Sequence, residues 1–290
     1  MHRIDTSTAQ KDKFGAGKNG FTGGNPQTGE LPTALNAEFF DSVQEEIASI
    51  IEAAGITLSN ASNNQLLAAV KGLVGSGRLL NVQVFYNSGT YTATQSTKRV
   101  LVELVGGGGG SAGSRAAGTG QISIGGAAGA GSYAKGQFTQ NFNGVQVTVG
   151  TKGIGGSVSG PYATDGGASS FGSLLTAAGG SAGQPAGPTN TFPFSTVAAV
   201  VSAGSNGANI IGTPGQGSSA SIAVSSAVVI ESPGGSSQFG AGGFITAFNS
   251  KGVNGSGYGA GGGPSKVNGS GVAVAGGDGS SGLVIIWEYS

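Results

Sequence analysis

The sequence predicts a mainly β protein, in which an extended leader and a short helical segment precede a glycine-rich domain resembling a β-sandwich. Ten of the 60 glycines lie in the first 80 residues, so 50 fall among the last 210. Charged residues are distributed the opposite way, with 14 in the first 80 positions and 12 in the rest. Between the glycine clusters, short runs of β-branched and aromatic residues recur at strand-like intervals. We therefore expect three segments, 1–33, 34–79 and 80–290.

Composition excludes several classes of function. There is no Cys, which excludes disulfides, thiolate zinc sites and cysteine nucleophiles, and the single His2 lies near the terminus. The formal net charge is zero, and no basic stripe exists to bind nucleic acid or anionic lipid. The longest apolar runs fall far short of the roughly 20 residues that span a bilayer. We expect no cofactor, no metal, no nucleic-acid partner and no membrane insertion.

Residues 1–33 predict an extended leader. The stretch "KDKFGAGKNGFTGGNPQTGELP" shows no period and is rich in Gly, Asn and Pro, so we expect it to lack its own core and to order against a partner. "GAGKN" at 15–19 is not a phosphate loop, because Asn19 replaces the required hydroxyl and no strand precedes it.

Residues 34–79 predict a helical hairpin. In 35–54, apolar residues spaced 3, 4, 3 and 4 apart form one stripe, and a second helix over 63–74 has its own apolar face. The stripe could pack within the chain or join identical chains, and the sequence leaves both readings open. The first stripe is Phe40, Val43, Ile47, Ile50 and Ala54, and the second face is Leu66, Leu67, Val70, Leu73 and Val74.

The glycine-rich segment predicts short strands. The first runs suggest a hairpin-like opening around the turn "NSG". The expected strands are 82–84, a run beginning at Tyr91, 99–105, 121–124, 132–139, 145–150, 197–203, 227–232, 244–248 and 283–289.

Fifty glycines bring no side chains to a core, and each loses more backbone freedom on folding than any other residue. We therefore expect backbones to approach closely, in stacked sheets or in polyproline-II-like glycine layers. The related motifs "GGASSFG" (166–172) and "GGSSQFG" (234–240) are expected to be tight turns, with Phe171 and Phe239 anchoring each turn in the core.

Catalysis is not expected. Hydrolysis of a polysaccharide needs paired carboxylates, whereas the acids after residue 80 are scattered singly. Glu103 and Glu288 lie in expected strands and are predicted to face outward, while Asp165 and Asp278 precede glycines in turns.

Irregular loops provide the candidate binding surface. Aromatic side chains on proline-rigidified loops gain contact area at low entropic cost, which favours recognition. The alternative for the two phenylalanines is that they cap the core. The candidate receptor-binding residues are Pro161, Tyr162, Asp165, Phe192, Phe194 and Tyr258.

Several stretches resemble bacteriophage tail-fibre proteins. The opening "MHRIDTSTAQKDKFGAGKNGFTGGNPQTG", with "FFDSVQEEIASIIEAAG" and "NNQLLAAVKGLV", is similar to the N-terminal segment of fibres in Mu-like and other contractile-tailed phages and prophages. "VLVELVGGGGG", "GSYAKGQFT", "VQVTVGTKGIGG", "GGASSFGSLLTAAGG" and "GLVIIWEYS" resemble glycine-rich domains at the distal ends of such fibres. This chain is shorter and lacks a long repetitive shaft.

The resemblance implies a part of the virion tail, made in the host cytoplasm. Its N-terminal segment would attach to a tail or baseplate protein, and its glycine-rich domain would bind a bacterial surface glycan or outer-membrane protein. Such fibres are usually elongated homotrimers, but the glycine-rich adhesins of T-even-type fibres are monomeric caps. Both states stay open, as does the need for a fibre-assembly chaperone. A purely structural fibre or connector is the alternative function, and a polysaccharide depolymerase or an ice-binding protein is less favoured.

Overall fold

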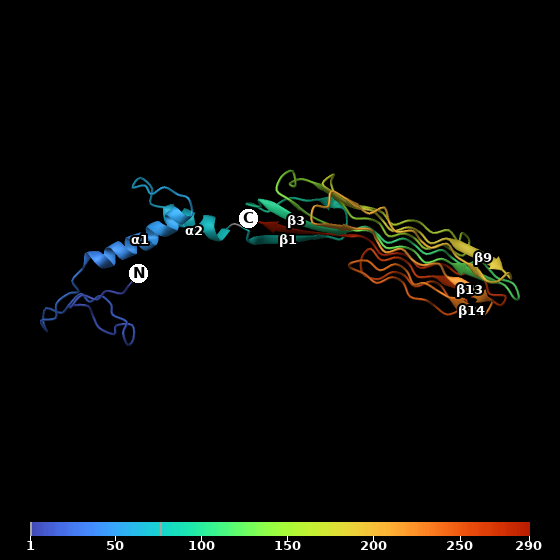
Figure 1. Cartoon of the computed structure of the whole chain (residues 1–290), viewed down its shortest axis with the longest axis horizontal. Coiled ribbons are helices and arrows are strands. Elements are labelled where there is room, and N and C mark those ends of the chain that lie inside the picture. Colours follow the sequence, from blue (N-terminus) through green and yellow to red (C-terminus); the bar gives the residue numbers. More distant parts are fainter. Residues whose placement is uncertain (1, 76) are drawn as a thin grey trace. The chain divides into compact units, whose positions relative to one another are not determined.

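The chain divides into two compact units, residues 1–78 and 79–290 (Figure 1). The computed structural model describes residues 2–75 and 77–290. The first unit holds two helices, and the second holds strands paired in antiparallel sheets. The predicted mainly β class is confirmed.

Both predicted helices form. They are α1 (Ala37–Ala53) and α2 (Gln65–Gly75), and they pack against each other. Ala48, Ile51 and Ala69 are the buried residues of the two helices. The predicted stripe is largely exposed, with Phe40 and Ile47 49% and 42% accessible. Packing within this unit therefore does not use the apolar stripe that the sequence predicted.

The leader contains no helix or strand between residues 2 and 36, and part of it contacts α1. Ile4 is 1% exposed, and the Phe21 ring meets Phe39 of α1 edge-on at 5.3 Å between centroids. An isolated bridge joins Gln10 to Gly20. The ring contact of the leader is therefore made with α1 of the same unit.

Two five-stranded sheets form a sandwich at one end of the second unit. They enclose the larger core, which includes Val102 and Leu104 from one sheet and Phe171 and Leu175 from the other. The first sheet runs β1 (Leu79–Phe85), β16 (Leu283–Tyr289), β3 (Arg99–Val105), β5 (Tyr133–Phe138) and β12 (Ile211–Thr213). The second runs β11 (Ser205–Asn206), β8 (Leu175–Ala177), β7 (Ser169–Phe171), β6 (Gln146–Thr148) and β2 (Gly89–Thr90).

Two three-stranded sheets lie at the other end of this unit (Figure 1). A smaller core of Ile122, Ile124 and Ala223 lies between them. One sheet runs β15 (Ser265–Asn268), β4 (Ile122–Gly125) and β9 (Pro185–Thr189), and the other runs β10 (Phe194–Ser195), β13 (Ile222–Ser225) and β14 (Val228–Ile230).

Long, nearly straight runs of backbone connect the two ends, and they hydrogen-bond with a period of three. In the central run, 106–114, every third residue donates its N–H to the same neighbouring run, at 2.9–3.0 Å. A polyproline-II helix has three residues per turn and no internal hydrogen bonds, so successive N–H groups point to three neighbours in rotation. The acceptors are Gly167, Thr164 and Pro161 for residues 107, 110 and 113; Ser280, Gly277 and Val274 for 108, 111 and 114; and Ser132, Gly129 and Gly126 for 106, 109 and 112.

The central run also accepts hydrogen bonds from three further segments. Gly180 donates to Gly107, Gly153 to Gly108 and Gly262 to Gly109, at 2.8–3.0 Å. Six neighbouring segments therefore surround it, which is the backbone packing that the glycine content predicts.

This packing leaves no room for side chains at residues 106–110 of the central run. A β-carbon at each of residues 106–110 would lie 1.9–2.2 Å from a carbonyl oxygen of a neighbouring run. Glycine is required here by close approach rather than by flexibility.

Three predicted strands are wrong: the run beginning at Tyr91, 197–203 and 244–248. Residues 196–203 form a polyproline-II-like run, since the buried residues Thr196, Ala199 and Ser202 recur every third position. Val197 and Val200 point to solvent with the same period. A strand would bury every second residue.

The predicted hairpin at the start of the domain is also wrong. β1 pairs with β16, the last strand of the chain, in the register Val84 to Ile285. The short β2 pairs with β6 instead.

The two repeated motifs take different structures. In "GGASSFG", residues 169–171 form β7, so the predicted tight turn is wrong, whereas Phe171 is buried in the larger core as predicted. In "GGSSQFG", residues 237 and 240 close a turn, but Phe239 lies outside both cores and packs edge-on against the Tyr133 ring at 5.9 Å. The predicted anchoring of Phe239 in the core is wrong.

Candidate functional site

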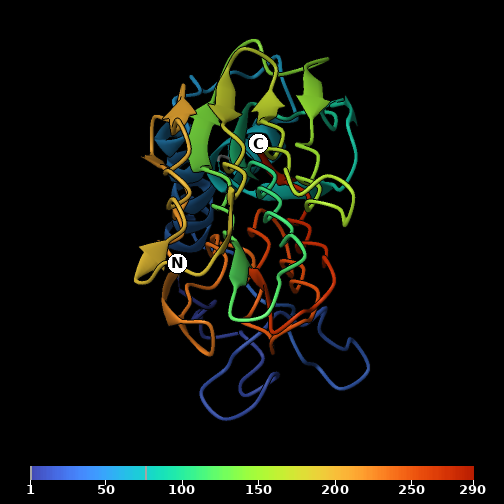
Figure 2. The ribbon, with the colours of Figure 1, turned by 90° about the vertical axis from the view of Figure 1, so that its right-hand side faces the viewer.

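Turns from distant parts of the sequence meet at the end of the second unit that carries the three-stranded sheets (Figure 2). We call them the distal turns: residues 117–121, 190–193, 225–228, 248–250 and 268–272. Hydrogen bonds connect them, since Thr119 and Ser270 share one at 3.2 Å and the Asn268 side chain donates to the Ser226 carbonyl at 2.8 Å.

Tyr162 is exposed, with 66% of its surface accessible. Its ring lies 6.0 Å from the guanidinium carbon of Arg115, and Arg115 donates to the Gly187 carbonyl at 2.8 Å. A cation over a tyrosine ring attracts the ring face. Tyr162, Arg115 and β9 are thus brought together.

Pro161 and Asp165 have structural contacts. The Pro161 carbonyl accepts from Gly113 of the central run at 2.9 Å, and the Asp165 carboxylate accepts from the Ala182 amide at 2.6 Å. Both residues therefore help to fix the backbone beside Tyr162.

Phe192 and Phe194 lie by the distal turns and are half-buried. Their ring centroids are 6.3 Å apart, and both pack against the smaller core. The structure thus shows the core contact that the sequence left as the alternative role for these two rings.

Tyr258 is not brought to the other candidates. It lies near β5, where the Gly131 amide donates to the Gly259 carbonyl at 2.8 Å, whereas Phe192 packs beside Ile122. The run between Ile122 and Gly131 spans about 28 Å at roughly 3.1 Å per residue. The predicted residues therefore form two separate groups.

A pocket of about 320 Å³ lies beside Tyr258's neighbours. We call it the side pocket. No charged residue lines it; its lining is Gly131, Tyr133, Thr213, Pro214, Gly215, Gln216, Ser236, Ser237 and Gln238.

The side pocket is built from three parts of the chain that the strand register joins. Thr213 of β12 is the cross-strand partner of Tyr133 of β5. The Gln216 side-chain oxygen accepts from the Ser236 amide at 2.9 Å, which holds the third segment in place. Sequence reasoning missed this site, although Ser236, Ser237 and Gln238 are the polar positions of "GGSSQFG".

The Tyr133 hydroxyl is already used. Burial, followed by a hydrogen bond to Glu103 and the charge of that carboxylate, raises the pKa of the Tyr133 phenol far above its usual 10.0. Glu103 in turn pairs with Lys135 at 2.7 Å. These contacts fix the ring at the pocket wall and leave its face, not its hydroxyl, for a ligand.

The carboxylates of this unit are held separately. Asp278 pairs with Lys152 at 2.7 Å, and Glu231 pairs with Lys266. No three His, Cys, Asp or Glu side chains gather to hold a metal ion anywhere in 2–75 or 77–290. Nothing in this arrangement brings together the two carboxylates that glycoside hydrolysis uses.

Glu288 corrects a prediction, because it is fully buried rather than outward-facing. Tyr91 and Gln83 donate to one of its oxygens at 2.8 and 2.7 Å, and the Thr94 amide donates to the other at 3.2 Å. Burial alone would raise the pKa of Glu288, but these hydrogen bonds outweigh it and lower the pKa below 4.5. Its role is to join β16 to the neighbouring segments.

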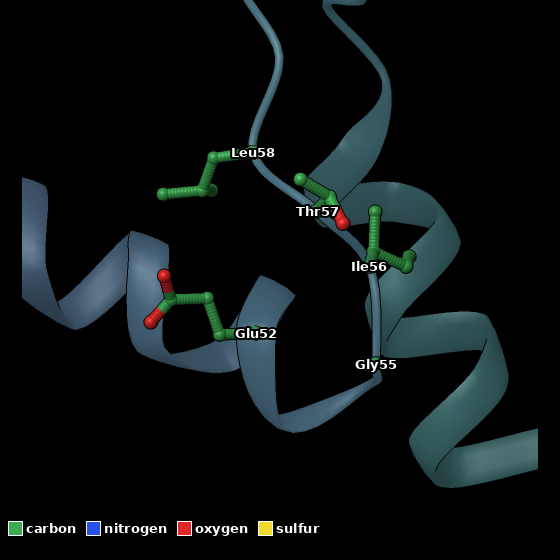
Figure 3. A pocket seen from close by; sticks show the side chains of 5 residues that line it. All are labelled: Glu52, Gly55, Ile56, Thr57 and Leu58. Carbon is green, nitrogen blue, oxygen red and sulfur yellow. The ribbon is translucent and has the colours of Figure 1, made fainter.

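A hollow of about 470 Å³ follows α1 in the first unit (Figure 3). Its lining is Glu52, Gly55, Ile56, Thr57 and Leu58. Its lining has one carboxylate, one hydroxyl and two aliphatic side chains, and so offers neither a second acid nor a cation. Neither α1 nor α2, the helices of the described residues, is long and apolar enough to cross a membrane.

Comparison with known proteins finds one relative of limited coverage. No family model matches the chain. A 74-residue stretch, 26% of this chain, is 60% identical to the Escherichia coli K12 protein named "Uncharacterized protein StfP". The match spans 35% of that protein's length.

Proposed function

We propose that this chain is a phage tail-fibre protein that attaches to the tail through its N-terminal segment and binds a bacterial surface receptor through its glycine-rich domain. One observation carries the proposal: the distal turns are held by a backbone scaffold, and the central run of this scaffold is hydrogen-bonded to six neighbouring segments. Loops held by a rigid scaffold are the usual place for recognition residues.

The direction of the chain supports the proposal. The second unit begins at Leu79, which pairs with Tyr289 in the first five-stranded sheet. This pair lies at the opposite end of β16 from Leu283, which pairs with Val105 of β3 just before the central run begins. The chain therefore enters this unit at the end opposite the distal turns. A fibre that attaches by its N-terminal segment needs its binding surface at the opposite end.

The resemblance of the leader and helices to tail fibres also supports the proposal. Their exposed apolar residues further support self-association, as in a homotrimer, because exposed apolar surface marks interfaces. Leu67 and Val74 of α2 are 57% and 72% exposed, and Ile47 of α1 is 42% exposed. A native mass of three chains is expected, and a native mass of one chain would contradict the homotrimer while leaving receptor binding possible.

Adsorption tests the receptor-binding function. Fluorescently labelled full chain is incubated with a panel of bacterial strains, and we expect saturable binding to some of them. Tyr162→Ala should weaken this binding, because it removes the exposed ring beside Arg115. Gln140→Ala is the control, since Gln140 is exposed in the turn that follows β5, at the sandwich end. Absence of binding to every strain would favour the purely structural fibre.

A further inference from the structure

The side pocket is the strongest unassigned site, and its chemistry selects one class of ligand. Its volume of about 320 Å³ lies within the range of small-molecule sites. Its wall combines one aromatic ring with amide and hydroxyl groups and contains no charged side chain. An anion would find no cation here, and an apolar ligand would leave the polar groups without partners.

Several polar groups of the pocket are free to bind a ligand. Within the described residues, the side chains of Thr213 and Gln238 make no hydrogen bond. Gln216 uses only its oxygen, so its NH₂ group can donate, and Ser236 accepts from Gly242 at 3.2 Å and keeps its own hydrogen. The pocket thus presents both donors and acceptors, which is what the hydroxyl groups of a sugar require.

Aromatic rings continue from the pocket in a row. Tyr133 meets Phe239 at 5.9 Å, Phe239 is the backbone partner of Tyr258, and Tyr258 lies 5.9 Å from Tyr86. Tyr86 is 58% exposed. Rings with one apolar face and a polar edge suit a ligand that is itself apolar on one face and polar at its rim.

We propose that the side pocket binds a neutral sugar, with the pyranose face on the Tyr133 ring and its hydroxyls on Gln238, Thr213 and Gln216. The aromatic row from Phe239 to Tyr86 then carries the next units of an oligosaccharide. This inference rests on the proposed function only in taking the sugar to be part of a bacterial surface glycan. The pocket itself binds the sugar whatever the glycan's source.

The test uses the full chain on an array of immobilised glycans that pairs neutral hexoses, 6-deoxyhexoses and N-acetylhexosamines with uronic acids. Neutral sugars should bind and uronic acids should not. Gln238→Ala and Thr213→Val should each weaken binding about five- to tenfold, since each removes a hydrogen bond to the ligand. Tyr133→Phe should bind nearly as well as the wild type, because the lost hydroxyl faces Glu103.

Gln140→Ala is the matched control, since it removes an exposed amide remote from the pocket. No binding to any neutral sugar, equal binding of uronic acids, or unchanged affinity in Gln238→Ala and Thr213→Val would each overturn the proposal. Sugar binding without adsorption to any strain would refute the receptor-binding function and leave the pocket intact. Adsorption to bacteria without sugar binding would refute the sugar pocket and leave the receptor-binding function intact.

Discussion

Replacing Gly108 with alanine tests the polyglycine packing directly. The new β-carbon would lie 1.9 Å from the Ala260 carbonyl oxygen and 2.3 Å from its carbon, atoms that belong to backbone and cannot rotate away. Ordinary contact begins near 3.4 Å, so the two runs would have to separate by about 1.5 Å. This separation stretches the hydrogen bond of 3.0 Å that Gly262 donates to Gly109 between these two runs.

The expected cost follows from these contacts. A buried hydrogen-bonding group left without its partner costs about 1–3 kcal/mol, and overpacking a tight interior costs a similar amount. We expect Gly108→Ala to lower the free energy of unfolding by about 3 kcal/mol or more. For a unit of this size, that loss lowers the unfolding midpoint by roughly 6–12 °C.

Calorimetry of the full chain measures this shift, and Gly160→Ala is the matched control. A β-carbon at Gly160 would meet only the Ser157 hydroxyl, at 3.7 Å, so this variant should stay within about 0.5 kcal/mol of the wild type. If the two variants melt at the same temperature, the six-neighbour packing around the central run is refuted.

Three further perturbations test other contacts. Tyr91→Phe removes a donor to buried Glu288 and should cost about 1–3 kcal/mol by urea unfolding. Because the folded pKa of Glu288 is lowered, its stabilisation is complete above pH 4.5 and lost as pH falls through that folded pKa. Without the Tyr91 donor the folded pKa is less depressed, so the loss should be smaller and end at higher pH in the variant, and identical pH profiles would contradict the role. Lys266→Met leaves Glu231, whose side chain is 2% exposed, without its cation and should cost about 3–5 kcal/mol at pH 7. Burial raises the pKa of Glu231 despite the opposing effect of Lys266, and removing Lys266 should raise this folded-state pKa further. The variant should therefore lose more stability than the wild type as pH rises from 4.5, and parallel pH profiles of the two proteins would contradict this role of Lys266. Gly72→Ala in α2 has open space around it and should stabilise that helix by up to about 1 kcal/mol, seen as increased protection from hydrogen exchange, whereas decreased protection would contradict the helix position.

Strand alternation made part of the fold predictable. Residues 99–105 and 283–289 were predicted as strands and are β3 and β16 with the same bounds, because both alternate apolar residues toward one face. The same alternation places Glu288 on the face of Val284 and Ile286, inside the core. Its outward orientation was predicted from charge alone, and the donors that make its burial tolerable come from residues about 200 positions away.

The exposure of Tyr162 was predictable from the sequence. Tyr162 follows a proline in an irregular stretch, and its side chain is exposed as that context suggested. The side pocket was not predictable, because Tyr133, Gln216 and Gln238 lie in separate parts of the sequence and each looks ordinary in its own context. Only the β5–β12 pairing and the bond from Ser236 to Gln216 bring them together.

By itself, the sequence determined the class of this protein: its glycine content rules out a thick side-chain core and requires backbones to approach closely. The tertiary structure decided which backbones meet. A polyproline-II-like run bonds only to other runs, so its local sequence does not specify its six neighbours. Those neighbours, and the turns and pocket that they position, are set by long-range pairing alone.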